Sequence, residues 1–354
     1  MISSLISKHK NSFLSFLFLI NFVLITFLFT PNTYAATSAS TTTKTVSTVA
    51  PASATASASA TASGGGSTSG GSGTITPDLF TGTLSYSIPI EVAPGRKGMA
   101  PSLALTYRSN GGNGWLGIGW DLEVGAIERS TKNGVNYTGD EFVLRIGGSA
   151  IDLVHIYTNE FGASVTDEYR AKIESGFSRI RKLSSADGPY WEVTDKSGTR
   201  YLYGQIVATR QDDPADATKI FKWCLDKVVD LNSNYMNLSY FKDQGEIYLD
   251  RIDYTGNGTT LPTTNYVKFW RDDGTRPDAT TKYTTKFGVK TALRLKTIEV
   301  RGNGNLIRAY KLMYAPSAST SRMRLSSMQQ FGKDAALDAN GTAGSNLTGS
   351  GLAS

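Results

Sequence analysis

The chain has 354 residues, a formal net charge of +6 and a single cysteine, Cys224. The length allows two ordinary domains, but the first part of the chain lacks the composition of a domain, so we expect one folded unit of roughly 250 residues. The basic excess is spread along the chain without a run of Lys or Arg, which argues against a nucleic-acid partner. An exported protein with one cysteine has no internal disulfide, so packing and hydrogen bonds alone hold such a fold.

The chain opens with the features of an export signal. Lys8 and Lys10 precede residues 13–29, which are almost wholly Phe, Leu, Ile and Val. A basic start before an apolar run is typical of a secretory signal, and a small-residue cleavage site ends at Ala35. We predict a signal peptide over residues 1–35 and a secreted or extracellular product, with the periplasm or cell surface as alternatives. A retained membrane anchor is the alternative to cleavage, and no membrane association is expected after cleavage.

Two low-complexity segments flank the central part of the chain. Residues 36–73 are dominated by Ser, Thr, Ala and Gly, with one charge at Lys44 and no aromatic residue. Such a segment has too little apolar surface to offset the entropy of ordering, so we predict a disordered, flexible linker. Residues 334–354 return to Ala, Gly, Asn, Ser and Thr and predict a flexible tail.

Residues 74–333 carry the pattern of strands joined by tight turns. Apolar residues alternate with polar ones, as in the runs 103–107 and 236–240. Turn sequences rich in Gly, Asn and Asp separate apolar runs, for example at 195–198, 230–234 and 302–305. These patterns predict an all-β fold, an irregular array of antiparallel hairpins that forms a sandwich or part of a larger β shell. Such an array exposes its edge strands unless another element continues the sheet.

The segment from Phe80 to Arg129 is the most distinctive part of the chain. It combines proline, glycine and aromatic residues in an unusual order, and its most characteristic members are Pro89, Pro94, Gly95, Gly98, Pro101, Tyr107, Asn113, Gly114, Gly117, Gly119, Trp120 and Arg129. The segment resembles the N-terminal domain of the Salmonella virulence plasmid B protein family (SpvB-type). The same domain opens the B component of insecticidal Tc toxin complexes and several YD-repeat, Rhs-like proteins.

The resemblance implies a β-rich element of an Rhs-like shell with structural family-motif residues. In Tc toxins such regions help to form a hollow cocoon around a cytotoxic fragment, and in the Salmonella protein the domain precedes an ADP-ribosyltransferase. The transferase arrangement Arg-Ser-Thr-Glu-x-Glu is lacking here, because no Glu-x-Glu pair follows Arg129-Ser130-Thr131. Relatives are usually much longer, so the chain is either a stand-alone module or the front end of a split or truncated gene. The implied partner is another polypeptide, a downstream toxin or shell component.

Two motifs resemble ligand-binding loops. Residues 112–117 have the spacing G-x-G-x-x-G of a dinucleotide-binding loop, but no helical pattern follows them, so a structural glycine-aromatic turn is the favoured interpretation. Residues 230–234 resemble the front half of an EF-hand calcium loop, but Tyr235 stands where that loop needs glycine. We expect a plain hairpin turn there.

The remaining candidate groups favour structural roles. Asp272, Asp273 and Asp278 form an acidic loop that we interpret as solvated charge. His155 lies in a strand-like run without a second histidine nearby, and Cys224 lies between Trp223 and Leu225 without a basic run, which predicts a buried, inert thiol. We therefore predict no catalytic residues, no cofactor and no metal site.

These observations favour a non-catalytic, exported, toxin-related structural module that encloses or docks another polypeptide. The alternative is a cell-surface or secreted binding module that recognises a glycan or a host protein through exposed aromatics. In the first case most tyrosines and tryptophans fill a core or line a shell interior, and in the second a set of them lies on one exposed face. An enzymatic function is a residual hypothesis.

Overall fold

The computed structural model describes residues 74–77, 82–161, 164–272 and 276–337. All of the described residues lie in one compact unit, within residues 65–354. The predicted signal peptide (1–35), the predicted linker (36–73) and most of the predicted tail lie outside the described residues. The domain boundaries therefore stay predictions.

The all-β prediction is confirmed, because strands make up 59% of the described residues and helix 1%. Eight strands form a closed barrel in the order β13-β12-β11-β10-β9-β8-β7-β15, and β13 closes the ring by pairing with β15. The barrel strands are β7 (Ala126–Arg129), β8 (Phe142–Ile146), β9 (Ser149–Phe161), β10 (Ser164–Ala171), β11 (Arg179–Ser185), β12 (Gly188–Thr194), β13 (Arg200–Tyr203) and β15 (Asp216–Val229). A 3-10 turn, η1 (Val207–Thr209), and β14 (Arg210–Asp213) connect β13 to β15.

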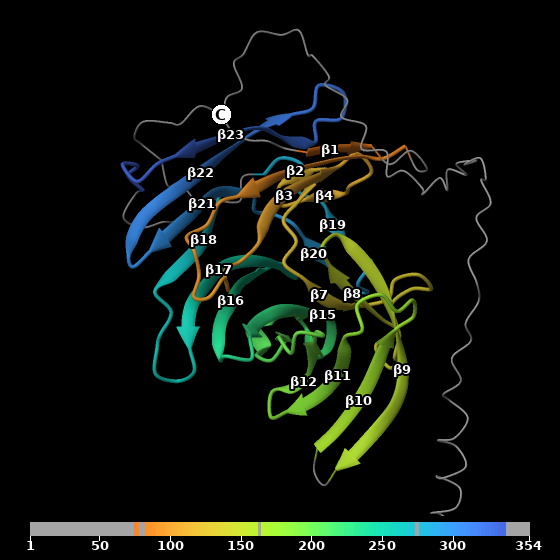
Figure 1. Ribbon diagram of the computed structural model, residues 1–354. Helices are drawn as coiled ribbons and strands as arrows, with labels where there is room; N and C mark the ends of the chain where they lie inside the picture. The colour runs from red at the N-terminus through yellow and green to blue at the C-terminus, as the bar shows by residue number, and fades with distance from the viewer. Residues whose placement is uncertain (1–73, 78–81, 162–163, 273–275, 338–354) are drawn as a thin grey trace, which may run out of the picture. The chain divides into compact units, whose positions relative to one another are not determined.

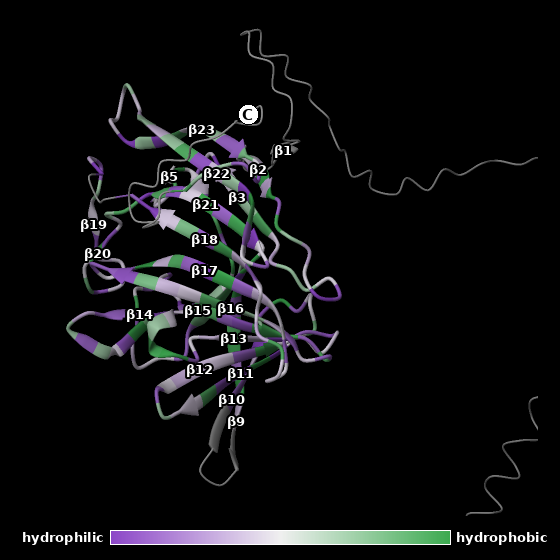
Figure 2. Ribbon diagram, turned by 90° about the vertical axis from the view of Figure 1, so that its left-hand side faces the viewer, coloured by the Kyte–Doolittle hydropathy of each residue, from purple (hydrophilic) through white to green (hydrophobic). Residues whose placement is uncertain are grey.

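An open antiparallel sheet continues from β15 (Figure 1). Its strands are β16 (Asn234–Asp243), β17 (Glu246–Asn257), β18 (Asn265–Arg271), β21 (Leu295–Gly302), β22 (Asn305–Pro316) and β23 (Met323–Phe331). Hydrophobic and hydrophilic residues alternate along several of these strands (Figure 2), as expected for strands with one buried face. The predicted runs 103–107 and 236–240 both lie in strands, and the predicted turns at 195–198, 230–234 and 302–305 join antiparallel partners.

Three small sheets accompany the main one. The largest has the order β1-β2-β3-β6, and the others are the hairpins β4-β5 and β19-β20. Their strands are β1 (Thr74–Pro77), β2 (Leu84–Ile90), β3 (Leu103–Arg108), β4 (Asn113–Gly114), β5 (Gly117–Ile118), β6 (Trp120–Asp121), β19 (Thr281–Lys282) and β20 (Val289–Lys290). The four-stranded sheet and the open sheet share one hydrophobic core, and the Tyr254 hydroxyl of β17 donates a hydrogen bond to the carbonyl of Ala93 (2.9 Å), just after β2.

One main hydrophobic core runs through the barrel, the open sheet and the four-stranded sheet. Aromatic rings dominate its barrel part, where the ring centroid of Phe142 lies 4.8 Å from that of Trp191 and 5.8 Å from that of Trp223. Such edge-to-face contacts stabilise aromatic pairs beyond the area that they bury. None of the five tryptophans is exposed, so these rings belong to the interior, as the first of the two alternatives predicts.

Candidate functional site

The motif residues 113–120 form two tight reversals between β3 and β7. Asn113 and Gly114 of β4 pair with Gly117 and Ile118 of β5, and Trp120 of β6 then pairs with Tyr107 of β3. No helix follows the G-x-G-x-x-G spacing, since strands β5 and β6 occupy these positions. The predicted glycine-aromatic turn is therefore what the structure contains.

Two glycines in this turn occupy positions that exclude a side chain. Gly119 has a φ of +79°, and a Cβ there would lie 2.4 Å from a ring carbon of Tyr107. Gly117 has a φ of +84°, and its Cβ would lie 2.7 Å from the carbonyl oxygen of Met323 at the start of β23. Positive φ and close backbone approach are the conditions that require glycine. Because these two glycines lack side chains, the turn can pack closely against both β3 and β23.

Asn113 links this turn to the long connection between β18 and β21. Its amide donates a hydrogen bond to Asp278 (3.0 Å), its side-chain oxygen accepts one from Arg276, and its carbonyl accepts one from Lys282 (3.1 Å). Asp278 also pairs with Arg276 (2.6 Å) and accepts the backbone N–H of Met323 (2.7 Å). Burial raises the pKa of Asp278, but these hydrogen bonds and the Arg276 charge outweigh burial and lower it to about 2.

The interpretation of the acidic loop as solvated charge is wrong for two of its three members. The Asp278 side chain is 9% exposed and ion-paired with Arg276, and Asp272 pairs with Arg294 at 2.5 Å. Asp273 lies outside the described residues. Arg276 is only two residues from Asp278, but the Asn113 amide and the Met323 N–H, which also bind this carboxylate, come from distant segments, so a local charge pattern could not show how it is held.

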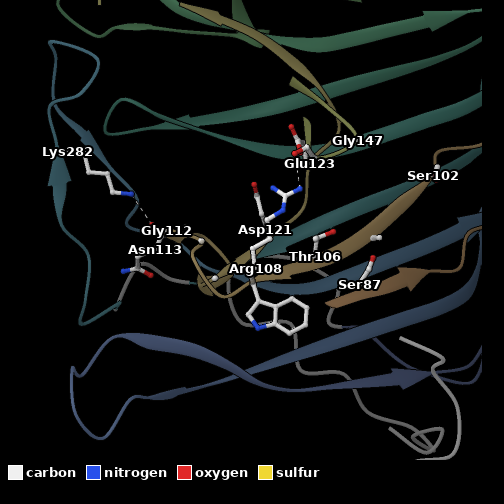
Figure 3. Close-up of a pocket in the computed structure, with 16 residues that line it drawn as sticks. Ser87, Ser102, Thr106, Arg108, Gly112, Asn113, Asp121, Glu123, Gly147 and Lys282 are labelled. Atoms are coloured by element: carbon white, nitrogen blue, oxygen red, sulfur yellow. Dashed lines mark hydrogen bonds between the residues drawn. The ribbon is translucent and has the colours of Figure 1, made fainter. Parts of the chain in front are cut away.

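A cleft of about 550 Å³ opens beside the motif turn (Figure 3). Small residues of β2 and β3 line part of it, including Ser87, Ala104 and Thr106. Charged and polar side chains line the rest, from β3, the turn, the following segment and β19: Arg108, Asn113, Asp121, Glu123 and Lys282. Four of the predicted motif residues therefore meet at one place, namely Asn113, Gly114, Gly119 and Trp120.

The charges of the cleft balance one another. Arg108 donates a hydrogen bond to the carbonyl of Gly148 in the β8-β9 turn (3.0 Å), which joins the four-stranded sheet to the barrel. Burial, followed by the nearby Asp121 carboxylate, raises the pKa of Glu123. The cleft thus presents both positively and negatively charged hydrogen-bonding groups. Its lining contains neither histidine nor cysteine.

Arg129, the last motif residue, lies apart from the cleft at the end of β7. Its guanidinium donates hydrogen bonds to the carbonyls of Ile220 (3.0 Å), Asn136 (2.9 Å) and Gly139 (2.9 Å). The guanidinium carbon also lies between 5.1 and 5.7 Å from the ring centres of Tyr137, Phe142 and Trp223. Arg129 therefore ties the loop between β7 and β8 to the barrel, which is a structural role.

Pro89, Pro94, Gly95, Gly98 and Pro101 lie in β2 and the loop that follows it. That loop contains the close backbone approach of Arg96 and Met99, whose N–H donates to the Arg96 carbonyl (3.0 Å). The loop connects β2 to β3, and these five motif residues are not in the lining of the cleft, although Ser102 at the end of the loop is.

Among the buried acids that sequence reasoning missed is Asp226, where the barrel closes. Between the β13 and β15 partners Leu202–Lys227 and Tyr203–Leu225 the register shifts, and Asp226 is the extra residue of that bulge. Its Oδ2 accepts hydrogen bonds from the Gln205 N–H and from the Thr209 hydroxyl (3.1 Å), whereas Oδ1 is buried without a partner among the described residues. Burial raises the pKa of Asp226 to about 6.

The other candidate residues occupy structural positions. His155 lies in β9, 3.6 Å from a carboxylate oxygen of Asp167. Cys224 is buried in β15, and burial raises the pKa of its thiol to about 12, as expected for an inert thiol. Asp230 accepts the N–H groups of Asn232 and Asn234 (both 2.8 Å), so the calcium-like sequence is a hairpin turn closed by its own carboxylate.

Within the described residues, no group of three or more His, Cys, Asp or Glu side chains is placed to hold a metal ion. In the same part of the chain, no helix has the length and apolar character needed to span a bilayer.

The fold and the site define an all-β module in which a closed barrel continues into an open sheet. A family model described as "Salmonella virulence plasmid 65kDa B protein" matches residues 78–251. Over this stretch the chain is similar to that SpvB-type family, as the motif residues predict.

Curated relatives carry the same name. "Mono(ADP-ribosyl)transferase SpvB" of Salmonella choleraesuis (strain SC-B67) is 32% identical over 193 residues, which is 50% of this chain and 32% of the relative. The protein of that name from Salmonella typhimurium is 31% identical over the same length. The chain thus spans about a third of the length of these relatives.

Solved structures share the fold. The N-terminal domain of effector protein SpvB from Salmonella typhimurium strain LT2 superposes with a TM-score of 0.60 and 20% identity, covering 69% of this chain and 98% of that one. TcdB2-TccC3 matches with a TM-score of 0.66 and 21% identity over 80% of this chain and 17% of that one. The Photorhabdus luminescens Tc holotoxin pore gives the same TM-score and identity over 80% and 16%.

Proposed function

We propose that this protein is a non-catalytic, exported structural module that forms the N-terminal part of a toxin-related shell and encloses or docks another polypeptide. The family match and the likeness to Tc toxin components support this function. The motif residues support it as well, because they tie strands and loops together. The predicted signal peptide is the basis of the exported role.

The observation that carries the proposal is the open edge of the main sheet. At one end of the sheet the barrel closes through the pairing of β13 with β15. At the other end lies β23, nine residues long, and among the described residues only β22 pairs with it. Unpaired edges template the addition of further strands, and natural proteins rarely leave a long one uncovered. An edge of this length suits a strand from another polypeptide.

The alternative, a binding module with exposed aromatics, has weaker support. The exposed large aromatics among the described residues are Tyr157, Phe177, Phe241 and Tyr283, and they lie on four different elements. A glycan platform requires aromatic faces side by side, and this distribution does not provide them.

Co-expression of the full chain with the product of the adjacent downstream gene tests the proposal. We expect a stable complex, or a defined homo-oligomer, by size-exclusion chromatography with light scattering. A monomer that binds neither would contradict the proposed function. The intact mass of the native product shows in parallel whether the chain is recovered alone or as the front of a longer polypeptide.

Proline substitutions sharpen this test at the β23 edge. Gln329 and Gln330 are consecutive and pair with Lys311 and Tyr310 of β22. Because N–H groups alternate between the two sides of a strand, one substitution breaks a hydrogen bond to β22 and the other removes only an outward donor. The variant that removes only the outward donor should be the more stable of Gln329→Pro and Gln330→Pro. We expect this variant to remain folded and to lose its association with the partner polypeptide. Retained association in that variant excludes this edge as the contact.

A further inference from the structure

The outer face of the barrel carries an ordered set of arginines. Tyr169, Ile180 and Trp191 of β10, β11 and β12 point into the barrel core, so the residues that alternate with them point outward. Strand register places Arg170 of β10 beside Val154 of β9, and Arg179 of β11 beside Thr194 of β12, which in turn neighbours Arg200 of β13. A parallel row contains Glu168, Arg181 and Glu192.

The two glutamates of this face are buried beneath the arginines. Glu168 is 6% exposed and pairs with Arg170 (3.2 Å) and Arg179 (3.7 Å), and Glu192 is 7% exposed and pairs with Arg181 and, at 3.5 Å, Arg200. Each buried carboxylate is thus paired with two guanidiniums, although a single guanidinium would neutralise its charge. Four arginines against two glutamates leave a surplus of two positive charges on this face.

Three of these guanidiniums remain accessible to a partner. The side chains of Arg170, Arg179 and Arg200 are 48%, 54% and 52% exposed. Two of their ion pairs are long, at 3.5 and 3.7 Å, so their forked donors are only partly used. The carboxylates of the buried glutamates instead hold these guanidiniums in position.

An apolar border adjoins the arginines on β9. Val154, Ile156 and Tyr157 are 43%, 51% and 48% exposed, and Val154 and Tyr157 lie directly beside Arg170 and Glu168 in the strand register. Exposed apolar side chains next to arginine and tyrosine are typical of protein-protein contacts, where these residue types supply much of the binding energy. We call the four arginines and these three residues the arginine face.

We infer that the arginine face is a docking surface for an acidic polypeptide segment whose carboxylates alternate with apolar side chains. The surplus charge fits carboxylates, which arginine binds through two parallel hydrogen bonds, and the β9 border fits the apolar side chains. Nucleic acids and anionic membranes present closely spaced phosphates, and the two interspersed glutamates oppose a continuous anionic surface. The inference rests on the proposed function, because it names the chemistry of the partner.

The test uses fluorescence anisotropy of the full mature chain with a labelled peptide of alternating Glu and Leu. In the variant Arg170→Gln/Arg179→Gln/Arg200→Gln we expect affinity to fall about tenfold or more, since each lost charge pair contributes a modest share. The matched control, Lys97→Gln/Lys286→Gln/Arg322→Gln, loses the same net charge from exposed positions outside β23 and outside the arginine face, and it should bind like the wild type. Equal losses in both variants would overturn the inference.

Further variants separate the arginine face from a folding defect and from other ligands. Val154→Ser/Ile156→Ser keeps every charge and should still weaken binding several-fold, while the corresponding Arg→Lys variant should retain part of it. Unchanged binding in Val154→Ser/Ile156→Ser, or tighter binding of the wild type to phosphatidylglycerol vesicles or duplex DNA than to the peptide, would overturn the inference. If the complex with the neighbouring gene product persists in the arginine variant, the arginine face is excluded and the proposed function stands.

Discussion

The guanidinium carbon of Arg129 lies 5.1 Å from the centre of the Phe142 ring, directly across the β7-β8 pair. This contact brings a buried cation and the aromatic cluster of the barrel together. Backbone carbonyls and ring faces replace the water that the guanidinium loses on burial.

Replacement of Arg129 by methionine should therefore destabilise the protein by about 2–4 kcal/mol, because three carbonyls lose their donor while the side-chain volume is largely kept. Arg129→Lys should recover little, since one ammonium cannot reach carbonyls on both sides. Urea unfolding measures both effects. The exposed Arg322 provides the control, and Arg322→Met should change the unfolding free energy by less than about 0.5 kcal/mol. Equal effects at the two positions would exclude a special role for Arg129.

Gly119→Ala should cost about 2 kcal/mol or more, because its φ is positive and its Cβ would overlap the Tyr107 ring. Gly112 is a matched control in the same turn, since a Cβ there would have no neighbour within 4 Å. Thermal unfolding of the two variants compares them directly. A Gly112→Ala variant as unstable as Gly119→Ala would show that the turn tolerates no side chain for some other reason.

Asn113→Asp should destabilise the protein by about 1–3 kcal/mol at neutral pH. The new carboxylate would lie beside Asp278, which is ionised there because its pKa is about 2, and the donor to Asp278 would be lost. The loss should shrink as the pH falls and the new carboxyl group is protonated. Asn133→Asp, at an exposed turn position, should have almost no effect. A pH-independent loss at Asn113 would contradict this electrostatic explanation.

The pH dependence of stability should carry a contribution from Asp226. Its folded-state pKa of about 6 exceeds the ordinary value of 3.8, so between these pH values the native state binds more protons than the unfolded state. By linkage, this group makes the free energy of unfolding fall as the pH rises from about 4 to about 6.

Asp226→Asn should remove that contribution and raise stability at pH 7 by about 1–3 kcal/mol, because the amide oxygen still accepts hydrogen bonds without a buried charge. Denaturant unfolding at pH 4, 5, 6 and 7 measures the free energy of unfolding of the wild type and the variant. These pH values cover the range between the two pKa values of Asp226. Asp187→Asn, at an exposed turn, serves as the control and should leave the profile unchanged. A variant less stable than wild type at pH 7 would show that the carboxylate is needed in its ionised form.

The sequence predicted those features of the fold that depend on neighbouring residues. Alternation in 103–107 and 236–240 identifies strands because the side-chain period of a strand is local. The motif residues were recognised by composition, and Asn113, Gly114, Gly119 and Trp120 do meet at one cleft.

Features that depend on distant pairings were not predictable in the same way. Barrel closure requires Tyr203 to pair with Leu225 across a bulge, and neither residue carries a local signal for that contact. Asp278 seemed solvated because its neighbours Asn113 and the Met323 N–H are far away in sequence. The arginine face is likewise a product of strand register, since Arg170 and Arg200 become members of one row only when four strands align.

Strand β15 has both of its edges occupied for much of its length. One edge pairs with β14 and β13, and the other with β7 and β16, so Lys227 has cross-strand neighbours in both β13 and β16. The barrel and the open sheet therefore share strand β15. Unfolding of either part would break hydrogen bonds that this strand makes with the other. We expect residues 84–331 to unfold as one cooperative unit, so a protease cut or truncation between barrel and sheet would release no independently stable half.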